Sequence, residues 1–350
     1  MHFVSRKLGA FTALTMIGLA AGLGVGLGAA PASAQSTLAA VQKRGELVCG
    51  VNGQLPGFSM VNDRKEWQGL DVDLCRAIAA AVLGDAKKVK FIPLTAQQRF
   101  TALEAGEVDV LARNSSVTLQ RDAGSRIKYA AINYFDGQGF AVSNKLKVDR
   151  LALLSSATIC FTRSTTHEAN LVNWFRARQL RVTPQGYDTA EAMYDAFLGS
   201  RCVAATQDAS ALAATLARRG KSADFTVLPE IISKEPLGPY VRGGDDAWLD
   251  VVRWSHYAML EAEERGIDRS NVDSELRSPD PETKLFLGVV AGNGKALGLD
   301  EGWAYDIVRQ VGNYGESFER NLGLNSPLKL PRGLNALWNK GGQMYPPPMR

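Results

Sequence analysis

The chain has 350 residues, and its 40 Lys and Arg against 36 Asp and Glu give a formal charge of +4 at pH 7. Both signs are scattered along the sequence without a basic stripe or an arginine-rich arm, which excludes nucleic acid as an expected partner. The length exceeds what a single hydrophobic core usually holds, so we expect a globular protein of two lobes.

Residues 1–34 have the layout of a secretory signal peptide. Arg6 and Lys7 precede a long uncharged stretch, and an Ala-Ser-Ala sequence that ends at Ala34 provides small residues at the cleavage spacing. A retained membrane anchor is the alternative, because the uncharged stretch is long enough to span a bilayer. The many glycines of this stretch and the cleavage site favour a signal peptide that is cleaved off over a retained anchor. We expect an exported mature chain that starts at Gln35 with a formal charge of +2.

The four cysteines fall into two sequence pairs in a chain that we expect to be exported, where thiols are normally oxidised. Three disulfide connectivities are possible. We favour the one in which each bridge ties one lobe, Cys49 with Cys75 and Cys160 with Cys202. A zinc site is the competing interpretation, but there is no CxxC spacing and few histidines, so we expect no metal.

The mature sequence alternates short apolar runs with helical patterns, which predicts parallel βαβ units. The series restarts near residue 157, so we expect two α/β lobes with the ligand site between their strand ends. The expected strands are 46–51, 89–94, 108–112, 157–162, 181–187, 202–208 and 224–230. The expected helices are 71–83, with Asp71 as its N-cap, then 96–106, 166–179, 189–201, 209–220 and 247–266. Periodicity does not place the rest, which we expect to be a mostly helical appendage with a disordered end from Met344.

Polar side chains follow the strand at 108–112. Ser116, Thr118 and Arg121 together offer hydroxyls, a helix start and a guanidinium fork, which match the lone pairs of a carboxylate. A solvated turn with Arg121 on the surface is the alternative. The sequence therefore contains a candidate anion site at the end of this strand.

Three further segments are candidates for the same cleft. Thr165 with Glu168 fits a capping box, while the neighbouring Thr166 could contact a ligand. Asp208 ends a strand and is either a helix N-cap or a carboxylate for a ligand ammonium. Phe58, in the loop after the first strand, could cover a ligand side chain or pack in the loop.

The sequence contains no GxSxG elbow, P-loop or HExxH, and no GxGxxG follows the first strand. His256 lies within a helical pattern beside aromatic residues, where packing is the simpler interpretation. His167 follows the two threonines and could reach the cleft. A binding function fits these observations better than catalysis.

Taken together, the segments GLDVDLCRAIAAAV, VTLQR and TQD resemble the type II periplasmic amino-acid-binding proteins of ABC importers. The similarity extends over essentially the whole mature chain and is strongest to the general L-amino-acid-binding subgroup. It implies an α/β fold in which each lobe is a mostly parallel sheet flanked by helices, with two hinge crossovers and a C-terminal extension. The resemblance implies that lobe 1 consists of residues 35–140 and 235–266 and that lobe 2 consists of residues 141–234. Residues 267–350 would form the extension.

The resemblance also implies roles for individual residues. Arg121 would clamp the ligand α-carboxylate and Asp208 would hold the α-ammonium. Many members have an aspartate after the first strand, where this chain has Asn52, so a preference for basic side chains is not expected. The donors implied around the α-carboxylate are Asn114, Ser116, Thr118, Thr165 and Thr166.

The resemblance further implies a monomeric periplasmic receptor without a cofactor. It would close its lobes on an L-amino acid and deliver it to an inner-membrane permease with its ATPase. The alternative is a periplasmic enzyme on the same fold, of the cyclohexadienyl or arogenate dehydratase kind, which would use His167 or Glu168 as acid or base.

Overall fold

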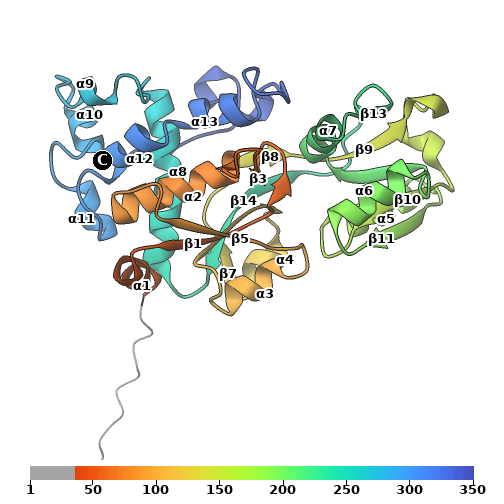
Figure 1. The fold of residues 1–350 in the computed structure, drawn as a ribbon, viewed down its shortest axis with the longest axis horizontal. Helices are drawn as coiled ribbons and strands as arrows, with labels where there is room; N and C mark the ends of the chain where they lie inside the picture. Colours follow the sequence, from red (N-terminus) through yellow and green to blue (C-terminus); the bar gives the residue numbers. More distant parts are fainter. Residues whose placement is uncertain (1–35) are drawn as a thin grey trace, which may run out of the picture. The chain divides into compact units, whose positions relative to one another are not determined.

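The structure, a computed structural model, describes residues 36–350, and the expected signal peptide lies outside the described residues. Its helices and strands follow one another as shown in Figure 1. Within this part of the chain, none of the helices combines the length and the apolar character that crossing a bilayer would require.

Lobe 1 is built on a six-stranded sheet with the order β5-β1-β6-β14-β7, and β8 pairs with β14 outside that path. β1 is parallel to β5 and β6, whereas β14 runs antiparallel to β6, β7 and β8. The strands are β1 (Leu47–Val51), β5 (Val89–Pro93), β6 (Val110–Ser116), β7 (Ile127–Tyr129), β8 (Tyr134–Asp136) and β14 (Glu235–Arg242). The helices are α1 (Thr37–Arg44), α2 (Leu70–Leu83), α3 (Arg99–Glu104), α4 (Leu119–Ala123) and α8 (Asp246–Glu264). A small antiparallel sheet adds β2 (Gln54–Leu55), β3 (Ser59–Val61) and β4 (Trp67–Gln68).

Lobe 2 repeats the arrangement on a five-stranded sheet with the order β11-β10-β12-β9-β13. β10 is parallel to β11 and β12, and β9 is antiparallel to β12 and β13. The strands are β9 (Gln138–Ser143), β10 (Thr158–Thr162), β11 (Thr183–Tyr187), β12 (Ala204–Asp208) and β13 (Phe225–Val227). The helices are α5 (His167–Ala177), α6 (Ala190–Leu198) and α7 (Ala209–Arg218), with the short turns η1 (Asn144–Leu146) and η2 (Leu151–Leu154). The two α/β lobes are confirmed, and the crossover strands make both sheets mixed.

The chain passes between the two sheets twice. The first crossing is abrupt, because β8 pairs in lobe 1 and β9 pairs in lobe 2 with only Gly137 between them. The second runs over residues 228–234, between β13 and β14. Phe140, the last residue of the first segment that the resemblance assigns to lobe 1, lies inside β9 and pairs with Thr206 of lobe 2.

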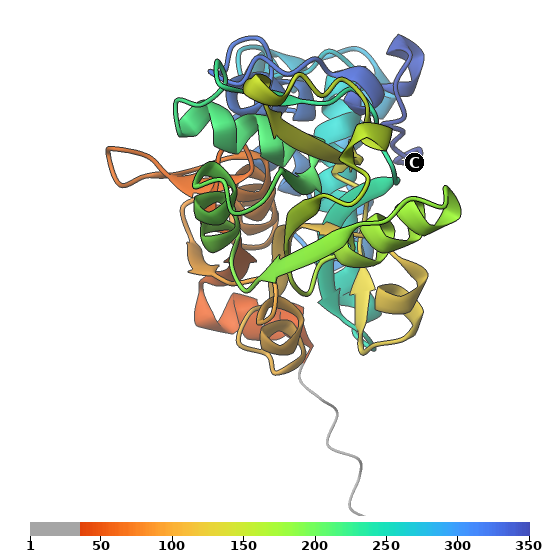
Figure 2. The same cartoon turned by 90° about the vertical axis from the view of Figure 1, so that its right-hand side faces the viewer.

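The C-terminal segment packs on the helices of lobe 1. α12 contacts α2 and α8, and α13 contacts α8 (labelled in Figure 1). In Figure 2 the blue C-terminal segment lies along the top of the molecule. α2 is therefore buried nearly all round, between the sheet and these helices. Met344 and Met349 are buried in the same core, so the expected disordered end is wrong. The helices and turns of the segment are α9 (Val272–Glu275), α10 (Pro281–Phe286), α11 (Asn293–Leu297), α12 (Trp303–Gln310), α13 (Tyr314–Asn321), η3 (Gly333–Asn335) and η4 (Trp338–Lys340).

The two disulfides confirm the favoured pairing. Cys49 of β1 is bonded to Cys75 of α2, which ties a helix of lobe 1 to its sheet. Cys160 of β10 is bonded to Cys202, just before β12, and ties neighbouring strands of lobe 2. All four cysteines are buried.

Candidate functional site

A cavity of about 280 Å³ lies where the two lobes face each other. Its walls come mostly from the carboxyl ends of strands and the loops that follow them, as expected for open α/β sheets. Lobe 1 contributes Asn52, Gly53, Gln54, Pro93, Leu94, Thr95, Ala96, Arg99, Arg113, Asn114, Ser116 and Arg121. Lobe 2 contributes Thr162, Thr165, Thr166, His167, Thr189, Ala190, Gln207 and Asp208.

The backbone near the end of β6 is held by the buried carboxylate of Asp71. Asn114 has a φ of 35°, a left-handed conformation that asparagine tolerates better than most residues. Its N–H donates to Asp71 Oδ2 at 3.0 Å, and its Oδ1 accepts from Asn52 Nδ2 at 3.2 Å. Asp71 also accepts from Asn133 Nδ2, and burial raises its pKa to about 6. Asp71 is therefore not the N-cap of α2, a position that Gly69 takes without a side-chain bond.

Arg121 lies in α4, which begins beside the end of β6. Thr118 is the N-cap, and its Oγ1 accepts from the Arg121 N–H at 3.2 Å. The guanidinium donates through Nη1 to the Ser116 carbonyl at 2.8 Å and lies over the Phe100 ring, 5.1 Å from its centroid. Burial lowers the Arg121 pKa, but an arginine keeps its charge in proteins. Arg121 is thus a fixed cation with free donors on the cavity wall, and not a solvated surface residue.

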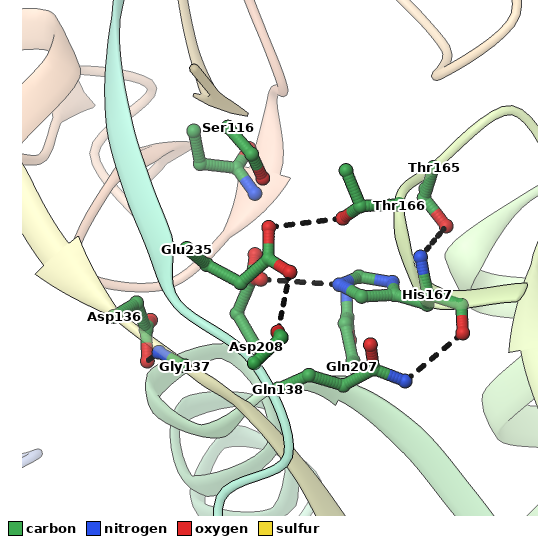
Figure 3. A network of polar contacts seen from close by, with 12 residues as sticks. Ser116, Asp136, Gly137, Gln138, Thr165, Thr166, His167, Gln207, Asp208 and Glu235 are labelled. Atoms are coloured by element: carbon green, nitrogen blue, oxygen red, sulfur yellow. Dashed lines mark hydrogen bonds and ion pairs between the residues drawn. The ribbon is translucent and has the colours of Figure 1, made fainter. Parts of the chain in front are cut away.

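The loop after β10 brings two threonines to the cavity, but not as a capping box. Thr166 is the N-cap of α5 without a side-chain cap bond, and Glu168 is exposed. Thr166 Oγ1 instead donates to Glu235 Oε2 at 2.9 Å (Figure 3). Thr165 Oγ1 donates to the Thr162 carbonyl at 2.6 Å. The predicted capping box is wrong because Thr166, not Thr165, takes the N-cap position, and the Thr165 hydroxyl accepts from the N–H of His167 at 3.3 Å rather than from that of Glu168.

Asp208 ends β12 and lies at the N-cap position of α7, yet its side chain makes no cap bond. Its carboxylate faces the cavity, where Oδ1 lies 3.1 Å from His167 Nε2 (Figure 3). Both side chains are about 4% exposed. The capping alternative is therefore wrong, and a buried carboxylate is available for a cationic group.

Two of the predicted site residues do not line the cavity. Thr118 is occupied as the cap of α4. Phe58 is 1% exposed and packs edge-to-face on Tyr134, with ring centroids 5.1 Å apart, in the core that the C-terminal helices complete. The other predicted residues do line it: Asn52, Asn114, Ser116, Arg121, Thr165, Thr166 and Asp208.

Sequence reasoning missed two further arginines in the cavity wall. Arg99 begins α3, and Arg113 lies inside β6 with its Nε bonded to the Leu94 carbonyl at 2.8 Å. A charged residue within an apolar strand was the available signal for Arg113. Three buried polar atoms of the wall have no hydrogen-bond partner within the described residues: Arg99 Nε, Thr162 Oγ1 and His167 Nδ1.

The remaining predictions from the sequence concern metals and the second histidine. Among residues 36–350, no group of three or more His, Cys, Asp or Glu side chains is placed to hold a metal ion. His256 is buried in the core, donates through Nε2 to the Ile132 carbonyl at 3.0 Å, and has a pKa lowered by burial to about 4. It lies outside the cavity lining, as packing predicts.

The chain matches the bacterial extracellular solute-binding proteins, family 3, over residues 47–276. It belongs to this family. The general L-amino acid-binding periplasmic protein AapJ of Rhizobium johnstonii is 46% identical over 336 residues, which cover 95% of this chain and 98% of the relative. The glutamate/glutamine/aspartate/asparagine-binding protein BztA of Rhodobacter capsulatus is 48% identical over 323 residues, 92% of this chain and 95% of the relative.

A solved structure supports the same assignment. A periplasmic binding protein of an ABC transporter from Brucella ovis, with glutathione bound, has a TM-score of 0.87 and 48% identity, and covers 91% of this chain and 100% of that one. The cysteine-binding protein of Campylobacter jejuni, at 22% identity and a TM-score of 0.58, shares the fold. The type II periplasmic binding fold and the membership of the solute-binding family are thereby confirmed, and the relatives are named as binding proteins.

Proposed function

We propose that this protein is a periplasmic receptor that captures L-amino acids and delivers them to an ABC importer, a permease with its ATPase. The observation that carries the proposal is the pairing of Arg121 and Asp208 across one cavity. A free amino acid carries one carboxylate and one ammonium on the same carbon. Two opposite charges fixed on facing lobes select that arrangement and leave the rest of the cavity to the side chain.

The α-carboxylate is proposed to bind the guanidinium of Arg121 and the Ser116 hydroxyl, with donors from Thr165 and Thr166 on lobe 2. The α-ammonium is proposed to bind Asp208. Each lobe supplies only part of these partners, so the ligand makes all its contacts only when the lobes are together, and closure about Gly137 and residues 228–234 is the expected response. The segment after β1 contributes only Asn52, Gly53 and Gln54 to the cavity, so it adds no charge that would select the ligand side chain.

We infer binding rather than catalysis. The dehydratase-like alternative needs an acid or base at the cavity, and Glu168 is exposed. His167 Nε2 is held by Asp208, which the proposal assigns to the ligand ammonium. AapJ and BztA are both named as binding proteins.

The proposal is tested by thermal unfolding of the mature chain, refolded to remove co-purified ligand. Tm is measured with and without individual L-amino acids or glutathione at about 1 mM. At micromolar affinity such a ligand adds about 4 kcal/mol to the folded state. We expect upward shifts in Tm with several L-amino acids and none with D-amino acids or with amines that lack the carboxylate. Arg121→Ala is expected to lose at least about 2 kcal/mol of binding. No shift with any L-amino acid would contradict the proposal.

A further inference from the structure

A second cavity, of about 420 Å³, lies where lobe 1 meets the C-terminal segment. It shares no lining residue with the cavity between the lobes. Its walls come from α2, α12 and α13 and from the turns after α2 and α8, and α2 contacts both α12 and α13 (Figure 1). The match to the solute-binding family ends at residue 276, so the walls from α12 and α13 lie beyond it. This cavity therefore depends on the C-terminal extension.

The side chains that line this second cavity carry an excess of positive charge. The cations are those of Arg76, Lys87, Arg269 and Arg320, and they face one carboxylate, that of Asp73. Four positive charges and one negative charge leave a formal charge of +3 on the lining. Charges of one sign that line a concave site raise the local concentration of the opposite ion. The second cavity is therefore a candidate site for an anion.

The carboxylate of Asp73 is already bonded to two of the four cations. Asp73 is 4% exposed, and its Oδ2 accepts from a hydroxyl and an amide of α13. The same oxygen accepts from Arg320 Nε at 2.9 Å, and Arg76 Nη1 lies 3.5 Å from Oδ1. Asp73 therefore compensates the arginines of α2 and α13 but not Lys87 or Arg269.

Lys87 and Arg269 keep their charged groups free. Their backbone N–H groups donate to carboxylates, that of Lys87 to Asp85 Oδ1 at 2.8 Å and that of Arg269 to Glu316 Oε2 at 3.3 Å. Within residues 36–350, however, neither charged group makes a hydrogen bond or an ion pair. Both side chains are exposed, so a solute can reach them. A guanidinium fork matches two oxygens of a phosphate, and an ammonium adds a compact charge beside it.

We propose that this second cavity is a binding site for a dianionic phosphate group, held by Lys87 and Arg269. A phosphate with two negative charges offsets most of the excess on the lining, whereas a single carboxylate offsets only one charge. The volume of about 420 Å³ has room for a soluble phosphate monoester as well as for the free ion. Because Lys87 follows α2 and Arg269 follows α8, the bound anion fastens the start of the C-terminal extension to lobe 1.

Isothermal titration of the mature chain with inorganic phosphate and with glycerol 3-phosphate tests the inference. The ionic strength is held constant with chloride near neutral pH, because salt screens exposed charges. We expect saturable binding to the wild-type chain. The double variant Lys87→Met with Arg269→Met should bind at least about 10-fold more weakly, since it loses charge-assisted hydrogen bonds.

A second double variant, Lys88→Met with Arg277→Met, is the matched control. It removes the same charge from two exposed positions that do not line the second cavity. Its affinity for phosphate should stay within about twofold of the wild-type value. All four substituted positions are exposed, so we expect both variants to fold.

The possible results separate the inference from its alternatives. If the wild-type chain does not bind phosphate, the inference is overturned. It is also overturned if Lys87→Met with Arg269→Met binds as tightly as the wild-type chain, or if the matched control weakens binding equally. If the expected losses are seen, the ratio of the two affinities identifies the ligand as a monoester or as the free ion. None of these results depends on amino-acid binding between the lobes, because the two cavities share no residue.

Discussion

The replacement Asp208→Asn tests the ammonium site without changing its shape. Asparagine keeps the size of the side chain and an oxygen that can accept from His167 Nε2, which lies 3.1 Å from Asp208 Oδ1. Asp208 is 3% exposed, so its carboxylate meets the ligand ammonium away from bulk water. Removing one partner of a buried charge pair weakens binding by about 2–5 kcal/mol. Because Asp208→Asn keeps an oxygen at the same position, we expect a loss of about 2–3 kcal/mol of binding free energy. We expect a Kd for L-amino acids that is roughly 30- to 150-fold weaker.

The assay is isothermal titration of the wild-type chain and Asp208→Asn with L-leucine and with its 2-hydroxy acid, in which a hydroxyl replaces the ammonium. The hydroxy acid should bind both proteins weakly and about equally, because it has no charge for Asp208 to hold. The four dissociation constants, for two ligands and two proteins, give the coupling free energy between Asp208 and the ligand ammonium, which we expect to be about 2 kcal/mol. If the variant weakens both ligands by the same factor, Asp208 does not contact the ammonium, and the assignment is refuted.

Three further changes test the surroundings of the site. Burial, with Asp208 nearby, raises the pKa of Asp136 to about 7, so its contribution to stability is present below about pH 4 and lost as the pH rises through 7. Asp136→Asn should therefore raise the free energy of unfolding more at pH 8 than at pH 4 in denaturant titrations, and an equal gain at both values would contradict this. Phe58→Ala should cost about 3–5 kcal/mol of stability and leave the ligand Kd within about twofold; weaker binding at unchanged stability would return Phe58 to the site. Replacing Cys160 and Cys202 by serine opens a loop with a sequence separation of 42 and should cost about 4 kcal/mol in denaturant titrations, whereas an unchanged midpoint would show that the bridge does not stabilise lobe 2.

The periodic parts of the chain were predictable because each helix or strand buries one side against a layer. The order of strands and helices and both disulfides followed from patterns that local chemistry controls. Seven of the nine predicted site residues line the cavity, but some of them, such as Asn52 and Asn114, came from the family resemblance and not from local patterns. Asp208 shows the limit: its position predicts both a helix cap and a ligand carboxylate, and only the structure shows that the cap bond is not made.

The errors arise where distant segments meet. Phe58 is buried by the C-terminal helices, and the sequence does not show where those helices pack. Arg99 begins a short helix, and nothing local indicates that its side chain reaches a cavity shared with lobe 2. The end at Met349 lacks periodicity, yet it is buried against helices far away in the sequence. Contacts of this kind depend on tertiary packing, which local patterns do not encode.

A crystal structure of the mature chain with a bound L-amino acid tests the central claim most directly. The account predicts the α-carboxylate within hydrogen-bond distance of the Arg121 guanidinium and the Ser116 hydroxyl, and the α-ammonium on Asp208, with both lobes in contact with the ligand. A ligand bound in this cavity with its ammonium away from Asp208, or bound outside the cavity, would contradict it.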